Sequence, residues 1–289
     1  MIKILNPKVS IIIPVYNDIK RLEKCLEALS KQTYEKKLTE IIVADNNSSE
    51  NIKDMVKKYN NVKYLLERKQ GSYAARNKGI EESSGDIIGF TDSDCIPNVD
   101  WIEQGVNNIN KVKSIGLVAG EVKLFYKNKR KMNSIEVYEY FHAFPQKYYV
   151  ENEKFGVTAN IFTSRKVIKN VGLFNEKLKS GGDHEWGNRV YKKGYKLLYS
   201  NNLIVKHPAR NTFKQIYKKH IRVKQGQFDL NENHNKIFVK NKFIDRIIPR
   251  EFFSDKISRI QKVKYIFARY VLKILLFGGD VKLFIKNLK

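Results

Sequence analysis

Cysteine is scarce in this chain of 289 residues, where Cys25 and Cys95 are the two examples. Two cysteines cannot build a disulfide framework or supply all the ligands of a cysteine zinc site. Such low usage is typical of a protein that works in a reducing cytosol. Cys95 follows an apolar run and adjoins acidic residues, and we interpret it as a buried thiol at a strand end in preference to a nucleophile.

Long hydrophobic runs are also missing. No stretch of about 18 uncharged apolar residues occurs, so we expect no membrane-spanning helix. The opening residues, MIKILNPKVSIIIPVYND, contain a short apolar run but no A-x-A-like cleavage site, so we expect no signal peptide. Hydrophobic residues still make up 42% of the chain and aromatic residues 12%, which predicts a folded protein with a sizeable core.

Several catalytic signatures are absent as well. The sequence has no Walker A motif and no G-x-G-x-x-G loop, which excludes the commonest phosphate-binding loops. G-x-S-x-G is missing, so serine hydrolase chemistry has no support. None of the five histidines falls in H-E-x-x-H or another zinc spacing.

Acidic residues are outnumbered, because 30 Asp and Glu face 55 Lys and Arg, for a formal charge of +25. Residues 206–289 hold 21 basic and 6 acidic residues, so they carry +15 of this excess. The basic character therefore belongs mainly to the end of the chain. We predict a main domain over residues 1–210 and a basic, amphipathic helical region over residues 211–289.

The N-terminal part alternates strand and helix patterns. Helical spacing of apolar residues, as in Leu22, Cys25, Leu26 and Leu29, separates runs that are β-branched and apolar. This alternation predicts an α/β fold, a mainly parallel sheet flanked by helices. Ligands bind beyond the carboxyl ends of such strands. The predicted strands are 9–13, 41–44, 62–66 and 87–91, and the polar segments that follow strands are 16–18, 45–49 and 92–94.

Asp92, Ser93 and Asp94 directly follow a hydrophobic strand. Two carboxylates at i and i+2 can point toward a common site, and hard oxygen ligands suit Mg²⁺ or Mn²⁺. A divalent ion there would stabilise charge on a leaving diphosphate. The alternative is a solvated turn that caps a helix. His207, after a later apolar run, is either a further metal ligand or an ordinary satisfied histidine.

A second acidic group stands in GGDHEW at residues 181–186. Asp183 and Glu185 beside Trp186 offer a general base and an acceptor-binding surface. The alternative is the capped start of a helix, where the helix dipole favours acidic residues. Residues 71–79, GSYAARNKG, predict a helix start whose Arg76 meets a phosphate or orders an acidic residue, or else merely packs on the sheet.

Together these motifs, in this order, resemble the inverting family 2 glycosyltransferases with the GT-A fold. The resemblance covers about residues 8–210. The segments that carry it are VSIIIPVYN at 9–17, IVADNNSS at 42–49, ARNKG at 75–79, FTDSD at 90–94, TANIF at 158–162, VGLFNE at 171–176 and GDHEW at 182–186.

The resemblance implies a role for each matching position. It predicts a nucleotide-sugar donor, with a UDP-sugar as the default, and Mn²⁺ or Mg²⁺ held by Asp94, Asp92 and His207. Asp183, with Glu185 as the second candidate, would deprotonate an acceptor hydroxyl, and Trp186 and Arg189 would serve the acceptor side. The residues implied on the donor side are Pro14, Tyr16, Asp18, Asp45, Arg76, Asp92, Ser93 and Asp94.

Two departures from the family pattern matter. The turn after the second strand reads DNNSS where many members have DDGS, so Asn46 replaces a carboxylate and leaves the donor open. The acidic motif reads GGDHE where GED is frequent, which leaves the choice between Asp183 and Glu185 open. The resemblance implies a glycan or lipid-linked glycan as acceptor, in the synthesis of cell-surface polysaccharide or glycoconjugate.

The basic tail contains an apolar stripe from Ile257 to Ile274, with Arg259, Lys262, Arg269 and Lys273 alongside it. A basic amphipathic helix is typical of attachment to an anionic membrane surface, which predicts a cytoplasmic, peripheral enzyme at the inner face of the membrane. The alternative is that the stripe packs on the catalytic domain. Two other functions stay open here: a nucleic-acid-binding protein, favoured by charge but lacking a recognised signature, and a nucleotidyltransferase of similar fold.

Overall fold

The computed structural model describes residues 6–233, 248–255 and 257–287. Contacts divide the chain into two compact units. The first contains residues 1–123, 144–177 and 182–207, and the second contains residues 124–143, 178–181 and 208–289. The second unit thus includes a segment from the middle of the sequence. The predicted division near residue 210, between a main domain and a basic helical region, stays a prediction.

Eight strands of the described residues form one sheet, in the order β3-β2-β1-β4-β7-β6-β8-β5. The first four strands in this order are parallel to one another, as the alternating pattern predicts. β7 instead runs antiparallel to β4 and β6. The strands are β1 (Val9–Val15), β2 (Thr39–Asp45), β3 (Val62–Leu66), β4 (Ile87–Thr91), β5 (Ile96–Pro97), β6 (Ile115–Phe125), β7 (Asn160–Ser164) and β8 (Lys196–Pro208).

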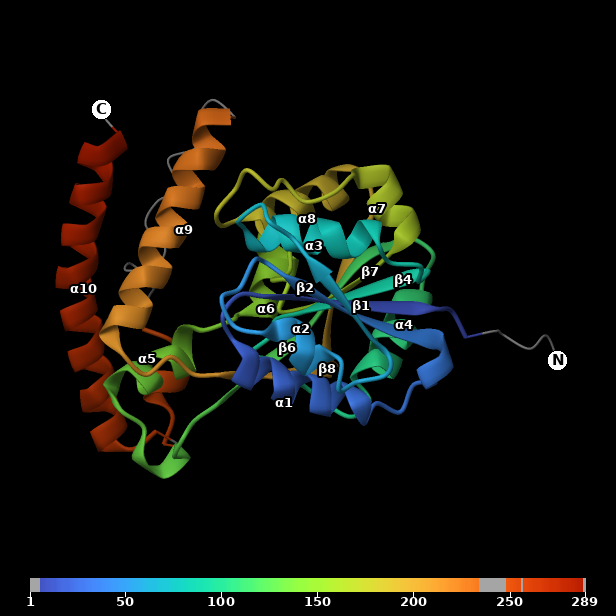
Figure 1. The fold of residues 1–289 in the computed structure, drawn as a ribbon. Coiled ribbons are helices and arrows are strands. Elements are labelled where there is room, and N and C mark those ends of the chain that lie inside the picture. Colours follow the sequence, from blue (N-terminus) through green and yellow to red (C-terminus); the bar gives the residue numbers. More distant parts are fainter. Residues whose placement is uncertain (1–5, 234–247, 256, 288–289) are drawn as a thin grey trace. The chain divides into compact units, whose positions relative to one another are not determined.

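Helices cover both faces of this sheet (Figure 1). β1 is buried along its whole length because its alternate residues serve two different cores. Ile11 and Ile13 join a cluster with Leu22 and Cys25 of α1. Ile12 faces α3 instead, where a Cβ on Gly79 would come within 2.5 Å of it. The helical segments of this unit are α1 (Ile19–Ser30), η1 (Lys36–Leu38), α2 (Ile52–Val56), α3 (Ser72–Glu81), α4 (Trp101–Asn110), α6 (Gln146–Tyr148), η3 (Tyr149–Glu153), α7 (Arg165–Val171) and α8 (Gly182–Lys192).

Both cysteines lie fully buried in this first unit. Burial raises the pKa of each thiol well above its ordinary value, with the nearby Asp92 and Asp94 adding to the effect. A buried, protonated thiol is inert. The interpretation of Cys95 as a buried thiol is therefore confirmed.

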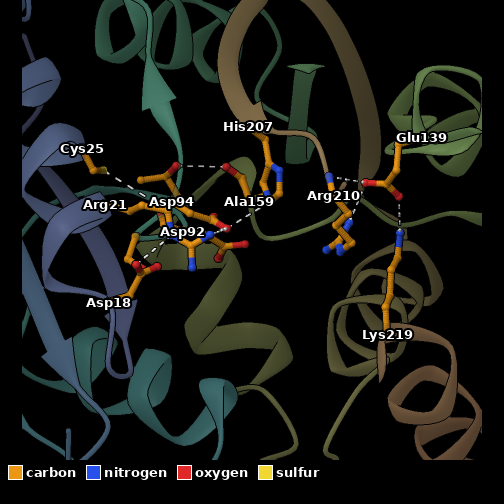
Figure 2. A network of polar contacts seen from close by, with 12 residues as sticks. Asp18, Arg21, Cys25, Asp92, Asp94, Glu139, Ala159, His207, Arg210 and Lys219 are labelled. Atoms are coloured by element: carbon orange, nitrogen blue, oxygen red, sulfur yellow. Dashed lines mark hydrogen bonds and ion pairs between the residues drawn. The ribbon is translucent and has the colours of Figure 1, made fainter. Parts of the chain in front are cut away.

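The second unit is built from helices packed around aromatic side chains. Tyr265 of the last helix is completely buried, stacks near Tyr138 and shares a hydrogen bond of 2.9 Å with His142. Glu139 is also buried; burial acts to raise its pKa, but Lys219 and Arg210 outweigh this and lower it (Figure 2). The segments of this unit are η2 (Lys129–Lys131), α5 (Ser134–His142), α9 (Phe213–Asn233), η4 (Arg250–Phe253) and α10 (Arg259–Asn287).

Helix α10 has apolar residues on two opposite faces. One face packs inside the second unit through Tyr265, Ala268, Leu272 and Leu276. At 100° per residue the opposite face carries large apolar side chains that are exposed. These are Ile260, Val263, Ile266, Phe267, Tyr270, Ile274 and Phe277, and we call them the outer face of α10. No helix in the described part of the chain is long and apolar enough to cross a membrane.

Candidate active site

The loops after β1 and β2 are joined by hydrogen bonds. Asn17 adopts a left-handed conformation, with φ of 49°, and its Oδ1 accepts from the backbone N–H and hydroxyl of Ser49 at 2.8 and 3.0 Å. Its own N–H donates to Ser48 Oγ at 2.9 Å. Tyr16, beside this junction, is 55% exposed. The two predicted nucleotide loops therefore form one surface, with Tyr16 available on it.

Asp45 ends β2 and is almost completely buried. Its Oδ1 accepts from Ser48 N at 2.9 Å, and its Oδ2 accepts from Tyr64 Oη at 2.9 Å. Burial together with this hydrogen bond raises the pKa of Tyr64 to about 12, so the phenol stays a donor at neutral pH. Pro14 is buried too, in register with Ala44. Both residues shape the loop from within.

Asn46, the departure from the family pattern, fixes the next loop. Its amide nitrogen donates to the carbonyls of Glu67 and Lys69 at 3.1 and 2.7 Å, and its Oδ1 accepts from Gly71 N at 2.7 Å. An amide supplies both donors and an acceptor, which a carboxylate cannot do. Asn46 thus sets the entry to α3, the helix that carries Arg76.

Arg76 joins α3 to the acidic motif after β4. Its Nη2 donates to Asp92 Oδ1 at 2.5 Å, and its side chain is 4% exposed. Its Nε is buried without a hydrogen-bond partner among the described residues. A buried guanidinium with a free N–H is suited to a phosphate oxygen. The prediction that Arg76 orders an acidic residue is therefore matched by a direct ion pair.

Asp94 lies at the centre of a chain of polar contacts (Figure 2). Its Oδ2 is 3.4 Å from His207 Nε2 and 3.7 Å from Arg21 Nη1. Arg21 Nε in turn donates to Asp18 Oδ1 at 2.7 Å, and Ser93 Oγ donates to Asp18 Oδ2 at 3.4 Å. Burial raises the pKa of Asp94, with the charge of His207 acting against it. The fold thus brings Asp94 and His207 together from distant parts of the sequence and links Asp18 to them through Arg21.

The Asp94 and His207 pair fits a divalent cation. Two adjacent ligands at about 2.1 Å from an octahedral ion lie about 3 Å apart, close to the separation of these two atoms. Asp92 is engaged with Arg76 instead, and no three His, Cys, Asp or Glu side chains gather as a ready-made metal cage within residues 6–233, 248–255 and 257–287. Mg²⁺ commonly binds through one or two carboxylates plus substrate phosphates, which suits a partial set of this kind.

Asp183 begins the first turn of α8 and is held through one oxygen. Its Oδ1 accepts from His184 N at 3.0 Å and from Tyr73 Oη at 3.3 Å, whereas Oδ2 has no hydrogen bond among the described residues. Burial raises the pKa of this carboxyl, and the charge of Arg76 and these two hydrogen bonds act against the rise. A carboxylate with one fixed and one free oxygen is suited to accept a proton.

Glu185 is occupied differently, because both its oxygens bind Arg189. The guanidinium contacts them at 2.6 and 3.0 Å and also donates to the carbonyls of Val171 and Leu173. Trp186 is 1% exposed, packs on Phe174 and donates to Gly172 O at 2.9 Å. The indole therefore supports α8 from the core and offers no open face to a sugar. Arg189 orders the acidic segment through these contacts, and its role on the acceptor side stays a prediction.

Sequence reasoning missed Tyr73, Arg21 and Tyr64. Tyr73 stands in the GSYAARNKG segment itself, and Arg21 is three residues after Asp18, a spacing at which helical side chains meet. The sequence therefore contained a signal for Tyr73 and for Arg21. Tyr64 has no local signal, since its contact with Asp45 arises from strand pairing between β2 and β3.

Comparison with a solved structure identifies the fold. A solved structure of the mannosyltransferase PcManGT from Pyrobaculum calidifontis, in complex with GDP-Man and Mn²⁺, is similar to this chain with a TM-score of 0.61 at 16% identity. The similarity covers 95% of this chain and 74% of that one. The fold is thus that of the GT-A glycosyltransferases, which confirms the fold class predicted from the sequence.

Sequence comparison identifies the family. The model of glycosyl transferase family 2 matches residues 10–172. Glycosyltransferase AglE of Haloferax volcanii is 40% identical over 229 residues, which are 78% of this chain and 74% of that protein. A dolichyl N-acetyl-alpha-D-glucosaminyl phosphate 3-beta-D-2,3-diacetamido-2,3-dideoxy-beta-D-glucuronosyltransferase of Methanococcus voltae is 25% identical over 247 residues, 77% of this chain and 76% of that one. This chain belongs to glycosyl transferase family 2 and is a glycosyltransferase.

Family membership decides among the functions that the sequence left open. Neither a dedicated nucleic-acid-binding protein nor a nucleotidyltransferase is needed to explain the chain. The first acidic motif, at residues 92–94, lies in the matched region and the second, at residues 181–186, comes after it, whereas most of the excess positive charge lies beyond the matched region.

Proposed function

We propose that the enzyme transfers a sugar from a nucleotide-diphosphate-sugar, by default a UDP-sugar, to a hydroxyl of a glycan or lipid-linked glycan with inversion at the anomeric carbon. The observation that carries this proposal is the asymmetric environment of Asp183. Tyr73 and His184 fix one carboxylate oxygen, and the other is free to take a proton. The bidentate ion pair between Arg189 and Glu185 supports the choice of Asp183 as the base.

The chemistry assigned to Asp183 is a single displacement. Its Oδ2 accepts the proton of the acceptor hydroxyl while that oxygen forms a bond to the anomeric carbon. The bond between that carbon and the diphosphate oxygen breaks, and the nucleoside diphosphate leaves with the electron pair. Because attack comes from the face opposite the leaving group, the configuration inverts. Arg76, with its free Nε, is placed to bind the departing diphosphate.

We assign a divalent cation to Asp94 and His207, which would hold it, and Asp92 would be a further ligand if Arg76 binds the diphosphate. Bound Mn²⁺ or Mg²⁺ would supply positive charge for the departing diphosphate oxygens. The mannosyltransferase of similar fold was solved with Mn²⁺ and a nucleotide-sugar, which supports this assignment. Arg21 contacts both Asp18 and Asp94 and offsets part of their negative charge. Asp18 and Ser93 thereby hold Arg21 within reach of Asp94.

The donor nucleotide is assigned to the surface formed by the loops after β1 and β2. The exposed ring of Tyr16 is available to stack on a base. Asp45 and Pro14 are buried, so we assign them to the shape of this surface more than to direct contact. Asn46, which fixes residues 67–71, takes the place of a second carboxylate.

The acceptor is assigned to the lipid-linked class. The name of the Methanococcus relative describes a dolichyl phosphate-linked sugar as its acceptor, which supports this class here. Such acceptors present their sugar at a membrane surface, so an enzyme that acts on them gains from attachment there. We therefore place the enzyme peripherally on the cytoplasmic face of the membrane.

The outer face of α10 is the element that we assign to this attachment. Its apolar residues include Ile260 and Phe277, with 69% and 70% of their surfaces exposed. One border of this face is basic and consists of Lys262, Arg269 and Lys273. At about 100° per residue, these three residues lie 180–220° around the helix axis from Ile260. Apolar side chains bordered by basic ones suit the boundary between acyl chains and anionic headgroups. Each basic residue near such a surface contributes about 1 kcal/mol.

A transfer assay with a panel of nucleotide-sugars and a short polyprenyl-diphosphate-linked sugar tests the proposal. The expected product is a lipid-linked disaccharide whose new anomeric configuration, read by NMR coupling constants, is opposite to that of the donor. Asp183→Asn should bind the nucleotide in a thermal-shift assay but lose transfer by a few orders of magnitude. Retention of configuration, or normal transfer by that variant, would contradict the proposal.

A further inference from the structure

A cavity of about 730 Å³ in the first unit is lined by none of the residues assigned to the donor, the cation or the base. It lies among α6, η3, the end of α8 and the first half of β8. Six of its lining residues are charged or aromatic: Lys147, Glu151, Lys154, Tyr191, Lys196 and Tyr199. Its volume falls within the range of small-molecule sites. We call it the lysine–tyrosine cavity.

The charge of this cavity is positive and only partly balanced. Glu151 is the single acidic residue among the lining side chains, and it is paired with Lys147, whose Nζ lies 3.9 Å from Glu151 Oε1. Lys154 and Lys196 pair with no carboxylate among the described residues. Two uncompensated ammonium groups in one concavity raise the local concentration of anions. The cavity is therefore suited to a ligand with negative charge.

Aromatic surface accompanies this charge. Tyr191 is 50% exposed, and Lys154 Nζ lies over its ring at 5.4 Å from the centroid. Tyr199 adds a partly buried ring, whose pKa burial raises. A phenol ring offers an apolar face with a hydroxyl at its rim, a combination that suits a sugar ring with its mixed polarity. Charge and ring together favour an acidic sugar over a bare inorganic anion.

The segment beside the cavity, residues 153–155, packs against the helix that carries the proposed base. Phe155 contacts the ring of His184, the neighbour of Asp183, with 4.8 Å between ring centroids. Asn188 of α8 donates to Glu153 O at 3.2 Å, and a Cβ on Gly187 would come within 2.6 Å of Phe155. α8 thus carries Asp183 at its start and Tyr191 eight residues later, about 12 Å along the helix. An acceptor of a few sugar units can span that length.

We infer that the lysine–tyrosine cavity binds an acidic sugar unit of the acceptor glycan, at a distance from the reacting hydroxyl. Lys154 and Lys196 bind its carboxylate or phosphate, and Tyr191 packs on its ring. This inference rests on the proposed transferase function, since it names the acceptor class of the same enzyme. It makes the enzyme selective for glycans that already carry an anionic sugar.

Binding of defined oligosaccharides to the full chain tests this site. The probes are trigalacturonate, its neutral counterpart galactotriose, and inorganic phosphate, each titrated by calorimetry at low and moderate salt. We expect trigalacturonate to bind at least tenfold more tightly than either other probe, and to weaken as salt rises. Equal binding of phosphate would reduce the cavity to a general anion site and overturn the inference, as would equal binding of galactotriose.

Matched variants locate the binding. Lys154→Gln with Lys196→Gln should weaken trigalacturonate binding at least tenfold, and Tyr191→Ala should weaken it without changing phosphate binding. The control, Lys24→Gln with Lys113→Gln, removes the same charge from exposed positions outside the cavity and should bind normally. Unchanged binding in the first pair overturns the inference. A chain that binds trigalacturonate here yet transfers no sugar would instead contradict the proposed function alone.

Discussion

Tyr73 on α3 donates a hydrogen bond to Oδ1 of Asp183 on α8, a residue 110 positions later in the chain. The same phenol oxygen accepts from Asp183 N, and the Tyr73 ring packs against Phe174. This contact connects the helix that carries Arg76 with the helix that carries the proposed base. It fixes the direction of the free oxygen of Asp183.

Tyr73→Phe should therefore impair catalysis while leaving the fold intact. The ring and its packing remain, but the hydrogen bond that lowers the pKa of Asp183 is lost. We expect kcat to fall about fivefold, which corresponds to the roughly 1 kcal/mol that one hydrogen bond contributes. The acidic limb of the kcat profile should move to higher pH, with KM for the donor unchanged. The control is Tyr34→Phe, which removes a hydrogen bond to Pro7 O away from the site and should not move the limb.

Asp183→Asn should raise stability at neutral pH. Burial raises the pKa of Asp183 above its unfolded value, so the native state binds this proton more tightly than the unfolded state does. Ionisation then destabilises the fold as pH rises through that pKa. The loss is about 1.4 kcal/mol for each unit by which folding raises the pKa. Denaturant unfolding should show the variant to be more stable than the parent at pH 8 and equal to it near pH 3. A variant that is less stable at pH 8 would contradict this account.

Glu185→Gln distinguishes the two candidate bases. The change weakens the ion pair with Arg189, whose other donors still bind the carbonyls of Val171 and Leu173. We expect a loss of about 1 kcal/mol in the free energy of unfolding and less than a tenfold loss in kcat. Asp183→Asn is the matched comparison, because it also replaces a carboxylate by an amide on the first turn of α8. A larger loss of kcat in Glu185→Gln than in Asp183→Asn would assign the base to Glu185.

His207→Ala should raise the Mn²⁺ concentration needed for half-maximal transfer. His207 Nε2 approaches the same oxygen of Asp94 that we assign to the cation, so its loss removes one of few protein ligands. We expect a shift of at least tenfold, read by titration of activity with Mn²⁺. Asp94→Ala should abolish transfer at every concentration. The control is His142→Gln, a buried histidine of the second unit that bonds Tyr265, and its metal titration should match the parent.

Val263→Glu with Phe267→Glu should release the protein from anionic vesicles. Both side chains belong to the outer face of α10, and each contributes up to about 1.5–3 kcal/mol when buried. We expect at least a tenfold fall in the fraction recovered by vesicle flotation. The control is Val99→Glu with Val112→Glu, the same chemical change at exposed positions of the first unit. Equal recovery of the variant and the parent would contradict membrane attachment through the outer face. If the parent forms a dimer without vesicles and this variant dissociates it, the outer face instead binds a second copy of the chain.

Much of the fold could be predicted because strand and helix signals are local. The β-branched runs of β1, β2 and β4 lie where the sequence places them, and their parallel pairing follows from the intervening helices. The predicted stripe on α10 is present too, but Ile260, Val263 and Ile274 face outward. A period alone cannot tell which of two apolar faces is buried, because both Tyr265 and Phe267 fit a helical spacing.

The sequence by itself determined the chemistry available to this protein: the order of the acidic motifs, the separation of the basic tail, and the family to which they belong. Only the tertiary structure decided how each carboxylate is used. Arg189 binds both oxygens of Glu185, Arg76 engages Asp92, and Tyr73 leaves one oxygen of Asp183 free. The physical reason is that hydrogen-bond partners and burial set the availability and pKa of a carboxylate, and most of these partners come from elements distant in the chain.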